Sequence, residues 1–209
     1  MEHLDRLLAR YPVLEVAKQD IYRAFLTLKT CYEAGGKLLC AGNGGSAADA
    51  EHIVGELMKG FCLKREMAPE FADALMKTDA PMGAVLAQNL QGALPAIALD
   101  GHFALTTAYA NDCDPALCYA QQVYGYGNAG DVFLAITTSG NSKNILYAAT
   151  VAKAKGMKVI GLTGHKESKL SALADVCIRV PETETYMVQE LHLPVYHCLC
   201  LMLEEFFWQ

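Results

Sequence analysis

The feature that most constrains the fold is a glycine-rich turn between a short apolar run and an alanine-rich helical segment. The apolar run predicts a buried strand over 37–41, and the turn at 42–46 reads Gly-Asn-Gly-Gly-Ser. Ser46 can cap the helix that follows, where unpaired N–H groups and the helix dipole favour an anion. The same helix carries His52 and Glu56 one turn apart on one face. This segment therefore predicts an anion site that leads to an imidazole and a carboxylate.

A second polar loop follows a later apolar run at 131–136. It precedes a helix expected over 143–155 and consists of Thr137, Thr138, Ser139, Gly140, Asn141 and Ser142. Hydroxyls and backbone N–H groups can coordinate a phosphate without lysine or arginine. A Ser-capped helix with surface hydroxyls is the alternative here, as a plain tight turn is for 42–46. The loop at 42–46 matches neither the dinucleotide fingerprint nor the Walker loop, and no nucleotide cofactor is expected.

Strand-like and helix-like segments alternate along the chain, which predicts one α/β domain over 1–209. We expect a three-layer αβα sandwich around a five-stranded parallel sheet, of the flavodoxin or Rossmann-like kind, with ligands bound beyond the carboxyl ends of the strands. Residues 61–93 contain no long segment with helical or strand periodicity, and we interpret them as an insertion with short helices at 70–77 and 84–91. The insertion is either a lid or interface arm beside the site, or a plain surface excursion. The other expected elements are strands at 95–99, 157–162 and 176–180 and helices at 13–34, 103–110, 115–124 and 185–206.

Net charge, hydropathy and cysteine spacing indicate which partners and which cellular compartment to expect. The net charge of −6 gives no basis for a nucleic-acid surface or an anionic membrane partner. No apolar run reaches the roughly 18 residues that a membrane helix needs, and the first residues lack the pattern of a signal peptide. None of the eight cysteines forms a Cys-x-x-Cys pair. Buried reduced thiols, rather than disulfides or a cysteine zinc site, are expected, and they indicate the cytosol.

Several polar residues stand out as candidates for chemistry. His52 and Glu56 could ligate a metal or act as an acid/base pair, and a solvated helix face is the alternative. On the last helix, Gln189 and His197 are eight residues apart, so one edge could carry both. A buried histidine satisfied by a carbonyl is the alternative for His197. Asp112 could end a helix or contact a sugar hydroxyl.

These motifs together resemble the sugar isomerase (SIS) domain family, and within it the phosphoheptose isomerase branch. The resemblance rests on residues 40–46 with His52 and Glu56, on 137–142, and on 179–181 with Gln189 and His197, and it covers roughly 13–60 and 94–206. It implies an aldose–ketose isomerase that converts sedoheptulose 7-phosphate into a heptose 7-phosphate, or acts on a similar sugar phosphate, through an enediol. It also implies a homotetramer with sites shared between subunits.

The resemblance assigns roles by position. It implies Glu56 and His197 as the catalytic pair, without deciding which one takes the carbon-bound proton. It implies that His52 and Gln189 join this pair as the ligands of a zinc ion that some members bind. The implied substrate and phosphate positions are Asn43, Gly44, Ser46, Asp112, Thr137, Thr138, Ser139, Ser142 and Gln189.

The chain departs from the family pattern in three places. The 61–93 segment is longer than the usual link, Lys59-Gly60-Phe61 stands where an arginine is expected, and Tyr186 stands where an acidic residue is expected. The alternative function is a non-catalytic SIS module that senses a phosphosugar or binds a partner, and a phosphosugar lyase or epimerase is a third reading. The presence of Glu56 and His197 favours the isomerase.

Overall fold

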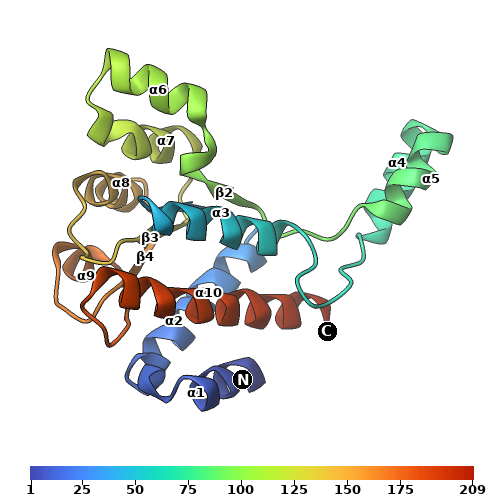
Figure 1. The fold of residues 1–209 in the computed structure, drawn as a ribbon. Coiled ribbons are helices and arrows are strands. Elements are labelled where there is room, and N and C mark those ends of the chain that lie inside the picture. Colours follow the sequence, from blue (N-terminus) through green and yellow to red (C-terminus); the bar gives the residue numbers. More distant parts are fainter.

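The computed structural model describes residues 1–209 and shows a parallel five-stranded sheet covered by helices on both faces (Figure 1). Every neighbouring pair of strands is parallel. The strand order is β2-β1-β3-β4-β5, with β1 at Leu38–Ala41, β2 at Ala96–Ala98, β3 at Val132–Ile136, β4 at Lys158–Thr163 and β5 at Val176–Arg179. The predicted αβα fold class is confirmed.

The helices cover the sheet largely where the sequence pattern placed them. They are α1 (Glu2–Arg10), α2 (Lys18–Glu33), α3 (Gly45–Met58), α4 (Pro69–Thr78), α5 (Ala80–Asn89), α6 (Phe103–Asp112), α7 (Cys118–Tyr126), α8 (Lys143–Ala154), α9 (Lys169–Leu173) and α10 (Thr185–Trp208). Short 3-10 helices lie at Pro12–Ala17, Leu99–Gly101 and Pro115–Leu117. None of the helices combines the length and the apolar character needed to cross a membrane.

The N-terminal region differs from the single helix expected over 13–34. The chain forms α1, then the 3-10 turn Pro12–Ala17, and only then α2. In α1, Leu4, Leu7 and Leu8 are buried, which is the spacing of one apolar helix face. Pro12 has no N–H to extend α1, so the chain turns there and lays α1 against α10.

Alternating strand residues build two cores, one on each face of the sheet. In β1, Leu38 and Cys40 pack into the larger core, whereas Leu39 and Ala41 pack into the smaller one. Helices α1, α2, α3 and α10 contribute to the larger core, and α7, α8 and α9 contribute to the smaller. Because both faces are buried, β1 and β3 are apolar at every position.

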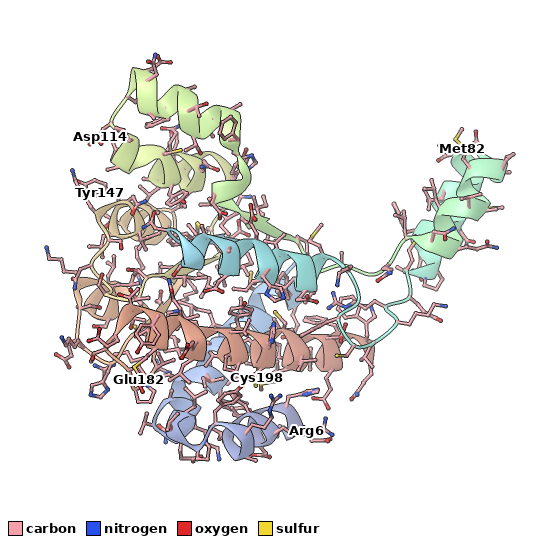
Figure 2. All side chains as sticks on the ribbon, in the orientation of Figure 1. Arg6, Met82, Asp114, Tyr147, Glu182 and Cys198 are labelled. Carbon is pink, nitrogen blue, oxygen red and sulfur yellow. The ribbon has the colours of Figure 1, made fainter.

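The insertion forms a helical hairpin that projects from the body (Figure 1). Its helices α4 and α5 pack on each other, and Met82 lies at the outer end (Figure 2). The side chain of Asp79 accepts the N–H of Met82 at 2.9 Å and caps α5, so this helix begins four residues before the expected start. The two predicted short helices are thus confirmed, with a longer second helix.

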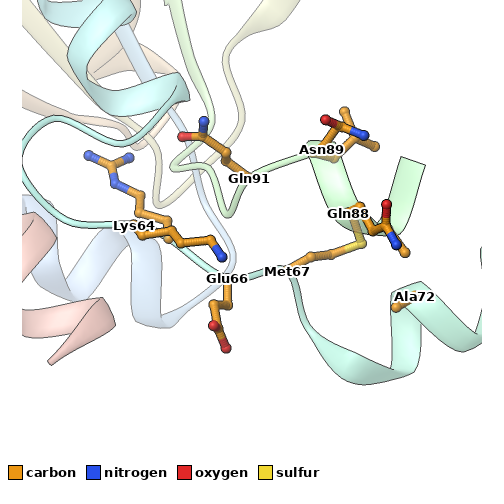
Figure 3. Close-up of a pocket in the computed structure, with 10 residues that line it drawn as sticks. Lys64, Glu66, Met67, Ala72, Gln88, Asn89 and Gln91 are labelled. Atoms are coloured by element: carbon orange, nitrogen blue, oxygen red, sulfur yellow. The ribbon is translucent and has the colours of Figure 1, made fainter. Parts of the chain in front are cut away.

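The two ends of the hairpin return to the body together. The N–H of Gly92 donates to the carbonyl of Arg65 at 3.0 Å. An open cavity of about 500 Å³ lies at this base, with Lys64 and Met67 on one segment and Asn89 on the other (Figure 3). The insertion therefore leaves and re-enters the fold at nearly one point.

The sheet order places the two polar loops next to each other. β1 pairs with β2 on one side and with β3 on the other, so the chain reverses direction across the sheet between them. Ala41 at the end of β1 is in register with Ala135 of β3. The loops 42–46 and 137–142 therefore start side by side at the carboxyl edge of the sheet, where α/β folds bind ligands.

Candidate functional site

Helices α3 and α10 lie side by side and run in the same direction (Figure 1). Near their N-terminal ends, Gln189 of α10 lies so close to Gly45 that a Cβ there would come within 2.9 Å of the Gln189 amide nitrogen. Two turns further on, the hydroxyl of Tyr196 is 3.0 Å from Nδ1 of His52. The helix pair thus presents a polar end at the loops and an imidazole-rich segment beyond it.

A polar cavity of about 120 Å³ lies where the two loops meet the helix pair. Its lining contains no charged side chain and consists of Asn43, Ser46, Ile136, Thr137, Thr138, Ser142, Thr185 and Gln189. The hydroxyls of Thr137 and Ser142 lie 2.9 Å apart. Helices α3 and α8 both begin at this cavity, so their first-turn N–H groups add positive partial charge. The site can hold a phosphate with N–H groups and hydroxyls alone.

The turn 42–46 needs glycine at two positions for different reasons. A Cβ on Gly42 would overlap the backbone of Ser46, so only glycine lets the chain turn this tightly. Gly44 has φ of 57°, in the region that favours glycine. Together they bring the start of α3 to the cavity.

The two loops are joined by a pair of asparagines. The amide of Asn43 donates to Oδ1 of Asn144 at 3.1 Å, and the amide of Asn144 donates back at 2.7 Å. Sequence reasoning identified Asn43 but missed Asn144, whose only sequence signal is its place in the first turn after the second loop. Ser139 lines a neighbouring polar cavity of about 210 Å³ that also includes Thr138. Thr138 therefore borders both cavities, and Ser139 faces the second.

The imidazole-rich segment brings together three of the predicted residues. Nε2 of His52 lies 3.3 Å from Oε1 of Glu56, and the rings of His52 and His197 meet edge to face with centroids 4.9 Å apart. Nε2 of His197 is buried without a hydrogen-bond partner. Burial, and then the charge of His52, lower the pKa of His197, while Glu56 opposes this shift. A neutral His197 and the Glu56 carboxylate, each of which lies next to His52, can exchange protons with a bound ligand.

A hydrogen-bonded chain fixes the orientation of His52. The hydroxyl of Tyr196 donates to Asp49 Oδ1 at 3.2 Å and lies 3.0 Å from His52 Nδ1. With its proton directed at Asp49, this hydroxyl accepts the Nδ1 proton of His52, and Nε2 points to Glu56. Burial raises the pKa of both Tyr196 and Asp49. Asp49 was missed by sequence reasoning, although it precedes His52 by three residues on the same helix face.

Only part of the expected zinc-ligand set is assembled. Two ligands of a tetrahedral zinc ion lie about 3.3 Å apart when each bond is about 2.0–2.1 Å long, which is the separation of His52 Nε2 and Glu56 Oε1. However, no group of three or more His, Cys, Asp or Glu side chains in the structure is arranged to hold a metal ion. Gln189, the fourth expected ligand, lies at the opposite end of α3.

Asp112 stands apart from the other predicted residues. It ends α6, a helix without a buried residue, and its carboxylate accepts the amide N–H of Asn111 at 2.8 Å. In Figure 1, α6 lies on the far side of α3 from α10. One chain therefore does not bring Asp112 to Glu56 and His197.

The sequence profile, the related sequences and the solved structures that match this chain all point to the same family. The sequence profile described as the SIS domain matches residues 92–202. The phosphoheptose isomerase of Rhodospirillum rubrum is 41% identical over 82% of this chain and 78% of the relative. Phosphoheptose isomerase 2 of Campylobacter jejuni is 38% identical over 88% and 79% of the two chains. The solved phosphoheptose isomerase of Neisseria gonorrhoeae superposes with a TM-score of 0.71 at 30% identity and covers 96% of this chain and 98% of its own.

Proposed function

The chain belongs to the SIS domain family, and from this premise we propose that it is a phosphosugar isomerase that converts sedoheptulose 7-phosphate into a heptose 7-phosphate. Curated relatives with the name phosphoheptose isomerase, 34–41% identical over most of the chain, support the isomerase class. The observation that carries the proposal is that α3 and α10 bring Glu56 and His197 to the two sides of His52, while the N-terminal ends of the same helices meet at a hydroxyl-lined cavity.

The proposed reaction moves one carbon-bound proton and one oxygen-bound proton. Glu56 takes a proton from C1 of the ketose, which forms an enediol, and returns it to C2. His197 carries a proton from the C1 hydroxyl to the C2 oxygen, so the product differs from the substrate only in the position of its carbonyl. Neither transfer needs an oxidant or a second substrate. The roles of the two residues can be exchanged without changing this balance.

The polar cavity supplies the proposed phosphate clamp. Ser46, Thr137, Thr138 and Ser142 surround it, and the N-termini of α3 and α8 face it. Holding the phosphate at this end sets the position of the distant carbonyl along α3 and α10, toward Glu56 and His197. Such positioning can account for a large part of the acceleration in a reaction with little covalent chemistry.

We also propose that the enzyme binds zinc through His52, Glu56, His197 and Gln189. The donor set of imidazole and oxygen groups is one that zinc accepts, and the Tyr196–Asp49 chain is the outer support that such a histidine has. Zinc would polarise the sugar carbonyl and stabilise the enediolate. Since the side chains as arranged do not form a complete site, binding requires a different arrangement of them. Metal analysis of protein purified without chelators tests this point.

We further propose that the protein is a homotetramer and that it is located in the cytoplasm. Asp112 has no site partner within its own chain, and the same helix exposes Phe103 (80% of its surface) and Leu105 (37%). A neighbouring subunit would cover this face and use Asp112 in its own site. All eight cysteines are free, which suits a reducing compartment.

Proton exchange in heavy water tests the proposed function. The protein is incubated with sedoheptulose 7-phosphate in D₂O, and deuterium at the carbons next to the carbonyl is followed by NMR. We expect deuterium to enter both the ketose and the aldose phosphate, and Glu56→Gln to lose about 10³-fold or more of the rate. Glu51→Gln, an exposed carboxylate on the same helix, is the control and keeps the rate. Sugar binding without exchange would identify a non-catalytic module, and a different product would identify a lyase or epimerase.

A further inference from the structure

A buried ion pair joins the end of α3 to α10. Nε of Arg65 lies 2.8 Å from Oε1 of Glu204, and the two side chains are 0% and 1% exposed. The guanidinium group also lies over the ring of Trp208, with Cζ 4.7 Å from the ring centroid. Arg65 is the largest fully buried side chain in the molecule that carries a charge. Such a pair is costly to desolvate, so the geometry of its remaining contacts indicates what it does.

The other two guanidinium nitrogens hold the end of α3. Nη1 of Arg65 donates to the carbonyl of Leu57 at 2.6 Å, and Nη2 donates to the carbonyl of Glu56 at 2.7 Å. These carbonyls lie in the last turn of α3, where the helix supplies no N–H partner and the dipole favours a cation. Arg65 therefore fixes the main chain of Glu56 itself. The main chain of Glu56, whose carboxylate we assign to proton transfer, cannot shift without breaking its hydrogen bond to Arg65.

Glu204 fixes the segment that follows α3. Its carboxylate oxygens accept the N–H groups of Phe61 and Cys62 at 2.7 Å and of Leu63 at 3.1 Å. Burial alone would raise the pKa of Glu204, but these N–H groups and Arg65 hold it below its ordinary value, so the carboxylate stays charged. The ring of Phe61 packs against the ring of His197 with centroids 5.4 Å apart. Glu204 thus supports one side of His197 through Phe61.

We propose that the Arg65–Glu204 pair is a positioning device that holds Glu56 and His197 at their working separation. The inference rests on the proposed isomerase function and adds two residues to it. Arg65 binds the main-chain carbonyl of Glu56, and Glu204 binds the main chain of Phe61, whose ring packs against His197. The ion pair between Arg65 and Glu204 connects these two contacts. Neither residue touches the polar cavity, so the pair acts on the chemical step and leaves phosphate binding alone.

A double substitution separates positioning from stability. Arg65→Met/Glu204→Leu removes both charges together with the partners of three backbone N–H groups and two backbone carbonyls, so we expect a lower unfolding temperature. Assayed well below that temperature, the folded variant should lose about 10- to 100-fold in kcat with KM within about twofold. Arg65→Lys keeps the charge but cannot reach Glu204, Glu56 and Leu57 with one ammonium group, so its kcat falls by a similar factor.

A second, half-buried ion pair provides the control. Lys37 Nζ and Asp131 Oδ2 lie 2.6 Å apart, and Asp131 also accepts the N–H groups of Lys37 and Asn128; none of these contacts involves α3 or α10. Lys37→Met/Asp131→Leu should leave kcat unchanged whatever it does to the unfolding temperature. Wild-type kcat in a folded Arg65→Met/Glu204→Leu variant, or a change in KM alone, would overturn the inference while the isomerase assignment stands. Absence of isomerisation by the wild-type enzyme would instead overturn the proposed function.

Discussion

The rings of His52 and His197 lie edge to face with centroids 4.9 Å apart, although they come from helices in different halves of the chain. This contact exists because α3 and α10 pack in parallel against the same face of the sheet. Each helix brings one end to the polar loops and extends away from them. Glu56 lies 3.3 Å from His52, two to three turns along α3 from the loops.

Tyr196→Phe is expected to reduce turnover through His52. The substitution removes the hydroxyl that contacts His52 Nδ1 at 3.0 Å and Asp49 at 3.2 Å, so the imidazole loses its fixed orientation. Loss of such an outer contact typically reduces activity or metal affinity about 10- to 100-fold. Steady-state kinetics and the zinc content of the purified variant measure the two effects. Tyr147→Phe on the exposed surface of α8 is the control, and equal kinetics for both variants would contradict the role of Tyr196.

Ser142→Ala is expected to weaken substrate binding while leaving the chemical step nearly intact. Ser142 lines the polar cavity and its hydroxyl lies 2.9 Å from that of Thr137. Loss of one hydrogen bond to a charged phosphate should raise KM about tenfold, with kcat within about threefold. Thr150→Ala, on the exposed face of α8, serves as the control. If KM for sedoheptulose 7-phosphate stays at the wild-type value, the phosphate does not occupy this cavity.

Much of the fold was predictable because local patterns determine it. The five strands are short apolar runs bounded by turn residues, and the loops after β1 and β3 carry their glycines and hydroxyls in sequence. Helix α9 was not predicted because five residues are too few to show a helical period. Helix α1 was also missed, although its buried leucines follow a helical spacing.

The sequence allowed the individual site residues to be predicted, but not most of the contacts between them. His52 and Glu56 share one turn of a helix, so their proximity follows from spacing alone. The contact of His52 with His197 depends on how α3 packs against α10, which no local pattern encodes. The same holds for the pairing of Arg65 with Glu204, neither of which belongs to a local motif. Their pairing through the core is a tertiary property, and it places a guanidinium group at the end of α3 although Lys59-Gly60-Phe61 stands where an arginine was expected.

His192 is expected to make the fold sensitive to acid. The side chain is fully buried with both ring nitrogens unpaired, and burial lowers its pKa from 6.5 to about 4. The folded protein therefore favours neutral His192; this stability is complete above the unfolded pKa near 6.5 and is lost as the pH falls towards 4. At a pH of about 4.5, the free energy of unfolding is lower by roughly 2–3 kcal/mol because of His192. Urea unfolding of His192→Leu should show a smaller drop between pH of about 7 and 4.5, and the exposed His165→Asn should behave like wild type.

Removing the helical hairpin is expected to leave the rest of the fold intact. Gly83 is the only buried residue in α4 and α5, and the N–H of Gly92 already contacts the carbonyl of Arg65 across the base at 3.0 Å. A short Gly-Ser linker in place of residues 67–89 should therefore lower the helical circular dichroism signal but shift the unfolding temperature by only a few degrees, about the effect of 1 kcal/mol or less. Gly83→Leu is the matched variant, because its side chain would strike the backbone of Leu75 and separate the two helices within an otherwise complete chain. A large fall in unfolding temperature for both variants would mean that the hairpin stabilises the body, either directly or by packing against a second subunit through the exposed side chains of Phe71, Met82 and Val85.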